Sequence, residues 1–302
     1  MGVLVCSSLD RRFTLCSRNL LGRHPACELR VDNPRISGEH ASVHWTGTRW
    51  ELRDLGSRNG TFLDGVRLAA GERRLLVEGA TFTLGAEDAF TLDDASAPVP
   101  SARHARSAAL RIAAEGLLVL PDDDRPEVSI FEDAGGRWVA ESRDETRVVV
   151  DREVVIADGE GWILDLPSAA GETWEARAFV PTLETIALRF GVSRNEEHVE
   201  ITVLHEGKAT ALPPRSHHYL LLTLARALLA DHAASAAERG WVDSQALCRM
   251  LATDPRSLNV DVFRARRQLA SLGVHGAVGI IARRTAAGQL RLGTDRIEVT
   301  RL

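Results

Sequence analysis

The chain has 302 residues, and its 44% hydrophobic and 26% charged side chains argue against a disordered or fibrous protein. Its formal net charge of −5 is uneven: residues 1–100 carry −1, residues 101–186 carry −9 and residues 187–302 carry +5, and the basic final third favours nucleic acid or another acidic partner. Because there is no apolar run of roughly 18 residues, no secretory signal in residues 1–10 and no C-x-x-C pair, we expect a cytoplasmic protein that contacts no membrane and binds no metal or cofactor.

Short strands separated by turn signals predict an all-β sandwich over residues 1–94. Residues 41–45 and 50–53 alternate apolar and polar side chains, and Gly47 lies between them as a hairpin turn. A second hairpin is expected around Asp64-Gly65, because glycine accepts the positive φ of a tight turn. Residues 95–109 are rich in Ala, Ser and Pro without an apolar period, so we expect a linker there.

Three short motifs lie on predicted loops of this sandwich. They are Gly22-Arg23, the run Ser37-Gly38-Glu39-His40, and the run Leu55-Gly56-Ser57-Arg58-Asn59-Gly60-Thr61. Their order and spacing resemble the G-R, S-x-x-H and N-G motifs of the forkhead-associated (FHA) domain, and the resemblance extends over residues 13–92. It implies a β-sandwich that binds phosphothreonine peptides. The implied peptide-binding residues are Arg23, Ser37, Gly38, Arg58 and Asn59, and the implied supporting residues are Gly22, His40, Gly60 and Thr61.

The residue types in these motifs suit a phosphate. A phosphothreonine carries about −1.5 to −2 charge and three acceptor oxygens, so its site needs a cation and short donors. Arg23 can offer a guanidinium fork, Ser37 a hydroxyl, and the backbone near Gly38 further N–H groups. The Asn59 amide can both donate to and accept from a peptide backbone. An alternative interpretation is that Arg23 pairs with a local carboxylate such as Glu28, while Ser37 and Asn59 cap turns.

Two residues of the motifs have roles other than direct phosphate binding. The resemblance implies that His40 supports the loops from within, and Gly60 permits the tight turn that presents Asn59. Arg58 stands where related proteins often carry a polar residue. It is expected either to add a second cation to the site or to point into solvent.

Residues 110–186 form an acidic region in which β-like runs recur, at 128–131, 137–140, 147–150, 154–156 and 162–164. No group of candidate catalytic or binding residues occurs there, so its role is not assigned.

The period of the hydrophobic residues changes in residues 187–302. Two or three strands are expected before residue 212, helices over 213–231, 242–251 and 258–272, a hairpin of 280–284 with 289–292, and a last strand at 297–300.

The third of these helices carries the second resemblance. The run from Leu258 to Leu269, with its apolar stripe and Arg266-Arg267 pair, is similar to the recognition helix of winged-helix effector domains of bacterial response regulators. We expect Val260, Phe263 and Leu269 in the buried stripe. The resemblance implies binding to double-stranded DNA. The expected DNA-binding residues are Asn259, Arg264, Arg267, Gln268, Arg283 and Arg284. The alternative is a winged helix that contacts protein, with its arginines on a solvated face.

No common nucleotide-binding, metalloprotease or hydrolase motif occurs, which argues against an enzyme. The sequence therefore predicts a multi-domain, non-catalytic bacterial regulator with an FHA-like sandwich, a β-rich middle region and an α+β winged helix. Its expected partner is a phosphothreonine-containing protein, such as a Ser/Thr kinase or a kinase substrate. The alternative function is a phospho-dependent adaptor. Opposite charges on the middle region and the final third suggest that the two regions contact each other until a phosphopeptide is captured.

Overall fold

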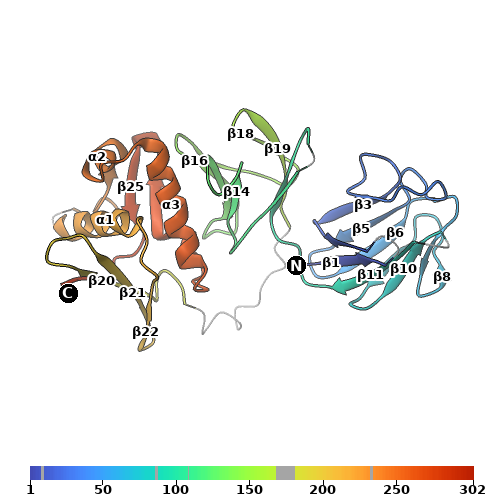
Figure 1. The fold of residues 1–302 in the computed structure, drawn as a ribbon, viewed down its shortest axis with the longest axis horizontal. Helices are drawn as coiled ribbons and strands as arrows, with labels where there is room; N and C mark the ends of the chain where they lie inside the picture. The colour runs from blue at the N-terminus through green and yellow to red at the C-terminus, as the bar shows by residue number, and fades with distance from the viewer. Residues whose placement is uncertain (8–9, 86–87, 108, 168–180, 232–233) are drawn as a thin grey trace. The chain divides into compact units, whose positions relative to one another are not determined.

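The computed structural model describes residues 1–7, 10–85, 88–107, 109–167, 181–231 and 234–302 (Figure 1). The chain divides into two compact units. Among the described residues, the first comprises those of Met1–Arg103, Asp151–Val154 and 163–167; the second comprises those of His104–Val150, Val155–Trp162 and 181–302.

The N-terminal unit is built on two β-sheets that pack around one core. The six-stranded sheet has the order β2-β1-β11-β10-β7-β8, and the five-stranded sheet has the order β4-β3-β5-β6-β9. The first consists of β1 (Val3–Cys6), β2 (Arg11–Thr14), β7 (Thr61–Leu63), β8 (Val66–Arg67), β10 (Thr81–Leu84) and β11 (Asp88–Asp94). The second consists of β3 (Arg18–Gly22), β4 (Leu29–Arg30), β5 (Ala41–Trp45), β6 (Trp50–Asp54) and β9 (Arg73–Leu76). The predicted β-sandwich is confirmed.

Alternation of inward and outward side chains explains this packing. In β6, Trp50, Leu52 and Asp54 are buried while the residues between them are partly exposed. Asp64 (φ 48°) and Gly65 (φ 81°) form the turn of the β7–β8 hairpin, and two successive positive φ angles are those of a type I′ turn.

Two four-stranded sheets follow in the chain. One has the order β13-β12-β19-β18 and the other β14-β15-β16-β17. Their strands are β12 (Ser101–His104), β13 (Leu110–Ile112), β14 (Leu118–Leu120), β15 (Val128–Glu132), β16 (Trp138–Ser142), β17 (Thr146–Val148), β18 (Val154–Ala157) and β19 (Glu160–Asp165).

The boundaries around these sheets differ from those expected. The segment 95–109 is not a continuous linker, because β12 lies within it and pairs with β19. The region 110–186 does not form one body either. Asp165 accepts a hydrogen bond from the Ser17 backbone N–H at 2.7 Å, and Asp151 lies 3.5 Å from the Arg18 guanidinium, so both belong to the N-terminal unit.

The C-terminal part has the expected order of sheet, three helices and hairpin. Its elements are β20 (Ala187–Val192), β21 (Val199–His205), β22 (Lys208–Ala211), α1 (His218–Ala230), β23 (Val242–Asp243), α2 (Ser244–Met250), α3 (Pro255–Ala270), β24 (Ile281–Arg284), β25 (Gln289–Leu292) and β26 (Ile297–Arg301). The strands form the sheets β22-β21-β20-β26 and β23-β25-β24.

Local chemistry explains where the helices begin. Helix α1 starts at His218 rather than at 213. The residue before a proline avoids helical backbone, so Pro213, which precedes Pro214, does not begin the helix. The Asp243 side chain accepts the Ala246 N–H at 2.9 Å as the N-cap of α2. Helix α3 starts at Pro255, three residues earlier than expected, with Asp254 as its N-cap.

The apolar stripe of α3 also differs from the expected one. Leu258, Val262, Ala265 and Leu269 enter the core of the C-terminal part, whereas Val260 is only partly buried. Phe263 belongs to a separate cluster with Leu117 and Val119. Helix α3 is therefore buried on two sides.

Candidate functional site

Strand β3 and the loop before β5 lie unusually close together at one edge of the sandwich. The Arg23 N–H donates to the Ser37 carbonyl oxygen at 3.0 Å, and the His24 N–H donates to the Gly38 carbonyl oxygen at 2.9 Å. A Cβ at Gly22 would lie 2.1 Å from the Gly38 carbonyl oxygen. Glycine at position 22 therefore permits the approach that places Arg23 beside Ser37.

His40 connects this pair of segments to the loop between β6 and β7. The ring is fully buried; its Nε2 lies 3.1 Å from the Gly60 carbonyl oxygen, and its Nδ1 accepts the Ser37 N–H at 3.2 Å. These contacts require a neutral ring with the proton on Nε2. Burial lowers the pKa of His40, against a smaller opposing effect of the Gly60 bond, which favours that neutral form.

The 54–61 segment is organised by Asp54, a residue that the sequence reasoning missed. Its carboxylate accepts hydrogen bonds from the Thr61 hydroxyl at 2.7 Å and the Ser57 hydroxyl at 2.6 Å, and from the Gly56 and Ser57 N–H groups at 2.8 and 3.1 Å. Burial raises the pKa of Asp54, but these bonds together outweigh burial and leave the pKa below its ordinary value. The inward register of β6 was the available signal for Asp54.

The Asn59 turn is held against the Ser37 loop by two further bonds. The Arg58 N–H donates to Ser37 Oγ at 3.1 Å, and Asn59 Nδ2 donates to the Arg35 carbonyl oxygen at 2.6 Å. Gly60 has a φ of 84°, and a Cβ there would lie 2.6 Å from Arg67 Nε. The structure thus brings the 22–23, 37–40 and 58–61 segments together.

The side chains expected to bind a phosphopeptide are accessible at this edge. Arg23, Arg58 and Asn59 are exposed, and Ser37 and Gly38 are partly exposed. Arg23 Nε donates weakly to the Ile36 carbonyl oxygen at 3.4 Å. Glu28, the carboxylate of the alternative interpretation, accepts the Leu20 N–H instead, and within the described ranges no ion pair joins Glu28 to Arg23.

The residues expected to bind DNA are not presented on one exposed face. Arg264 is exposed. Gln268 Oε1 lies 2.6 Å from His217 Nε2 and 3.0 Å from His218 Nε2, and its Nε2 donates to the Pro213 carbonyl oxygen. This residue therefore holds α3 to the start of α1 and is not available as a base-reading side chain.

Arg284 is also engaged within the C-terminal part. It forms a bidentate ion pair with Glu238, at 2.7 and 2.8 Å, and its guanidinium carbon lies 4.2 Å from the centre of the Trp241 ring. Both partners precede β23 in the chain, so Arg284 ties the hairpin to that segment.

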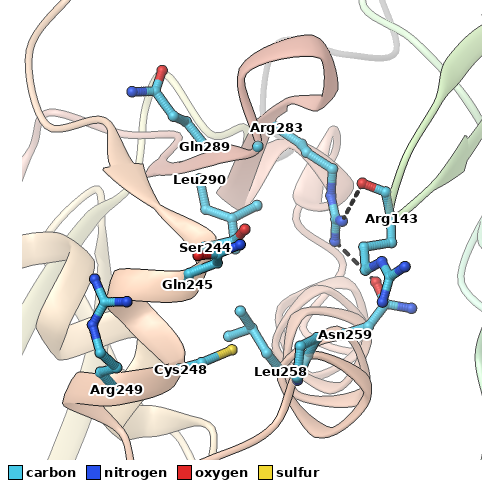
Figure 2. A pocket seen from close by; sticks show the side chains of 12 residues that line it. Arg143, Ser244, Gln245, Cys248, Arg249, Leu258, Asn259, Arg283, Gln289 and Leu290 are labelled. Carbon is cyan, nitrogen blue, oxygen red and sulfur yellow. Dashed lines mark hydrogen bonds between the residues drawn. The ribbon is translucent and has the colours of Figure 1, made fainter.

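The other three predicted DNA-binding residues contact the sheet β14-β15-β16-β17 or the loop between β14 and β15. Asn259 Nδ2 donates to the Pro126 carbonyl oxygen at 2.6 Å, and Arg267 forms an ion pair with Asp123. Arg283 Nε lies 3.3 Å from Glu141 Oε1, and Figure 2 shows the Arg283 guanidinium turned toward Asn259 and the loop that contains Arg143.

Arg266, which was expected to belong to the recognition helix without a named role, is the most buried member of this interface. It is 2% exposed and donates to both oxygens of Glu141, at 2.8 and 3.2 Å, and to the Ile281 carbonyl oxygen. The helical pattern could not distinguish it from Arg264, because no local signal identifies the remote carboxylate.

Over the part of the chain that the structure describes, no group of three His, Cys, Asp or Glu side chains has metal-binding geometry. No described helix is long and apolar enough to cross a membrane.

Comparison with known proteins agrees with the N-terminal geometry. Residues 19–85 match the family model of the FHA domain, and the N-terminal region is a β-sandwich of the FHA fold. Mycobacterium tuberculosis EmbR, solved in complex with a low-affinity phosphopeptide, is 23% identical, with a TM-score of 0.29 over 32% of this chain and 25% of EmbR. The N-terminal FHA domain of S. cerevisiae Rad53p, solved with a phosphothreonine peptide, is 20% identical, with a TM-score of 0.28 over 31% of this chain and 94% of that domain.

Among curated proteins, protein phosphatase 2C 70 of Arabidopsis thaliana is 32% identical over 74 residues. The match covers 24% of this chain and spans 13% of the phosphatase. The similarity is therefore confined to a small part of both proteins.

Proposed function

We propose that this protein is a non-catalytic signalling protein that binds phosphothreonine-containing proteins through its FHA fold. The observation that supports this is that Arg23, Ser37 and Asn59 lie together at one edge of the sandwich. His40 and the hydrogen bonds between their loops hold them there. The match of residues 19–85 to the FHA family model supports this proposal. A Ser/Thr kinase or one of its substrates is the proposed partner.

The chemistry of the edge suits a phosphate ester. The exposed Arg23 guanidinium can donate to two phosphate oxygens. Ser37 Oγ accepts the Arg58 N–H and still has its own O–H to donate to a phosphate oxygen. Asn59 uses its Nδ2 on the Arg35 carbonyl oxygen, which leaves Oδ1 to accept a peptide N–H.

The test is fluorescence anisotropy with a phosphothreonine peptide and its unphosphorylated counterpart. Arg23→Ala is expected to weaken phosphopeptide binding at least tenfold, because one charge-assisted contact contributes about 1.5–3 kcal/mol. Arg49→Ala, which removes an arginine near Gly47, is the matched control and should leave affinity unchanged. Equal affinity of the Arg23 variant and the wild type would refute the phosphate assignment.

We further propose that residues 187–302 are a winged-helix domain that binds double-stranded DNA and regulates transcription. The order of a small sheet, three helices and a β24–β25 hairpin supports this, as does the +5 charge. The free cysteines, which suit a reducing compartment, support a cytoplasmic location. Duplex DNA should bind with an affinity that falls steeply with salt.

The second candidate function is a phospho-dependent adaptor in which this domain contacts protein. The observation that favours it is the contact of α3 and β24 with the sheet β14-β15-β16-β17 and its β14–β15 loop, which occupies Asn259, Arg267 and Arg283. Absence of duplex binding at low salt, in wild type and in the opened variants described below, would leave the adaptor as the remaining function.

A further inference from the structure

Helix α3 is buried on two sides, and only one of them faces the core of its own domain. Phe263 is 4% exposed and packs with Leu117 and Val119 of the β14 segment, with Phe131 of β15 against the same cluster. Figure 1 shows α3 beside β14 and β16. The sheet β14-β15-β16-β17, called the cover sheet below, therefore lies on the side of α3 that faces away from α1.

The ion pairs across this interface join arginines of α3 and β24 to carboxylates of the cover-sheet region. The Glu141 carboxylate accepts hydrogen bonds from Arg266 at 2.8 and 3.2 Å, and it forms an ion pair with Arg283 at 3.3 Å. Asp123 forms an ion pair with Arg267. Glu141, Arg266 and Arg283 are each less than a tenth exposed. Two guanidinium groups thus share one buried carboxylate.

A contribution to folding stability does not explain why buried arginines and carboxylates form this interface. A buried ion pair is often no more stabilising than apolar side chains of similar volume, because each charge loses its hydration. Guanidinium forks, however, bind carboxylate and phosphate with the same geometry. Three arginines and Asn259 on one face are therefore the composition of a phosphate-binding surface.

We propose that the face formed by Asn259, Arg266, Arg267 and Arg283 is the DNA-binding surface of this protein, and that the cover sheet inhibits it. The proposal rests on the DNA-binding function proposed above. The Glu141 and Asp123 carboxylates occupy the arginines that would otherwise contact backbone phosphates. DNA binding at this face requires the cover sheet to separate from α3.

The test weakens the contact of the cover sheet with α3 without changing any residue of the proposed DNA-binding face. The variant Glu141→Gln/Asp123→Asn removes both carboxylate charges and keeps side-chain size. In the full chain it should lower hydrogen-exchange protection of α3 and raise affinity for a 20-base-pair duplex at least tenfold. The plot of log affinity against log salt should become steeper by roughly 3, because three more arginines contact phosphate.

The matched control is Glu160→Gln/Asp133→Asn. It makes the same change in net charge at carboxylates that pair with Arg106 and Arg137 rather than with the α3 face. Its DNA affinity should equal that of the wild type. A second opening variant, Val119→Asn, places a polar group in the apolar cluster without a charge change. Circular dichroism establishes that each variant retains its helices.

Each outcome decides the proposal. Tighter DNA binding in both opening variants, and not in the control, supports it. If the wild type binds DNA as tightly as the two opening variants do, inhibition by the cover sheet is refuted. The proposed DNA binding itself is then supported. If α3 loses hydrogen-exchange protection but no variant binds DNA, the proposed DNA binding is refuted, and the proposed phosphopeptide binding still stands. If the hydrogen-exchange protection of α3 is unchanged in both opening variants, the cover sheet does not separate from α3, and inhibition by the cover sheet is also refuted.

Discussion

Replacing Gly22 by alanine removes the close approach on which the candidate phosphopeptide site depends. The new Cβ would lie 2.1 Å from the Gly38 carbonyl oxygen and 2.9 Å from its carbonyl carbon, whereas ordinary contacts of a Cβ begin near 3.4 Å. The obstructing atoms are backbone, so no side chain can rotate away. Relief requires the two segments to separate by roughly 1 Å.

That separation would break the two hydrogen bonds between the segments, now 3.0 and 2.9 Å long. At about 1 kcal/mol for each bond, with overpacking strain of 1–3 kcal/mol, the free energy of unfolding should fall by roughly 2–4 kcal/mol. Arg23 and Ser37 would also lose their register, so phosphopeptide affinity should fall at least tenfold in the variant that remains folded.

Urea denaturation followed by tryptophan fluorescence measures the first effect, and peptide anisotropy the second. Gly38→Ala is the matched control: its nearest heavy atom would be His24 Cβ at 3.9 Å, so stability should change by less than about 0.5 kcal/mol. A Gly22→Ala protein with wild-type stability and affinity would refute the account of the site.

Other measurements address the buried polar groups. Thr61→Val should lower the free energy of unfolding by about 1–3 kcal/mol, measured in urea, because Asp54 loses a buried donor at 2.7 Å; wild-type stability would contradict this. Burial lowers the pKa of His217 to about 4, so the unfolded chain takes up the proton first, and up to about 3 kcal/mol of stability present above pH 6.5 should disappear as pH falls through 4. His217→Gln should flatten that profile, and an identical profile would exclude this histidine. Burial raises the pKa of Cys27, so iodoacetamide should label it at least tenfold more slowly in the folded chain than in urea at pH 8; equal rates would contradict its burial.

Most of the candidate phosphopeptide site could be predicted from the sequence, because it is made of short loops in which few residue types fit each position. Gly22, His40 and Gly60 occupy positions where only particular residues satisfy the backbone approach, the two-sided hydrogen bonding or the positive φ. Asp54 was missed because the inward register of β6 indicates only that its side chain is buried, and does not identify the donors that fold around the carboxylate.

The strand Ser101–His104 shows why the predicted linker failed. Its four residues have no apolar alternation, and they form a strand because β19, more than fifty residues away, supplies backbone partners. Short strands of this kind depend on pairing rather than on propensity.

The sequence by itself determined the β-sandwich, its loop motifs and the order of the C-terminal elements, because turn residues, caps and hydrophobic periods act over a few neighbouring residues. Only the tertiary structure decided which face of α3 is available. Arg266 and Arg264 have the same local pattern, but Arg266 meets Glu141 across 125 residues of chain whereas Arg264 is exposed. A helical period defines faces, and the remote surface that packs against each face assigns its role.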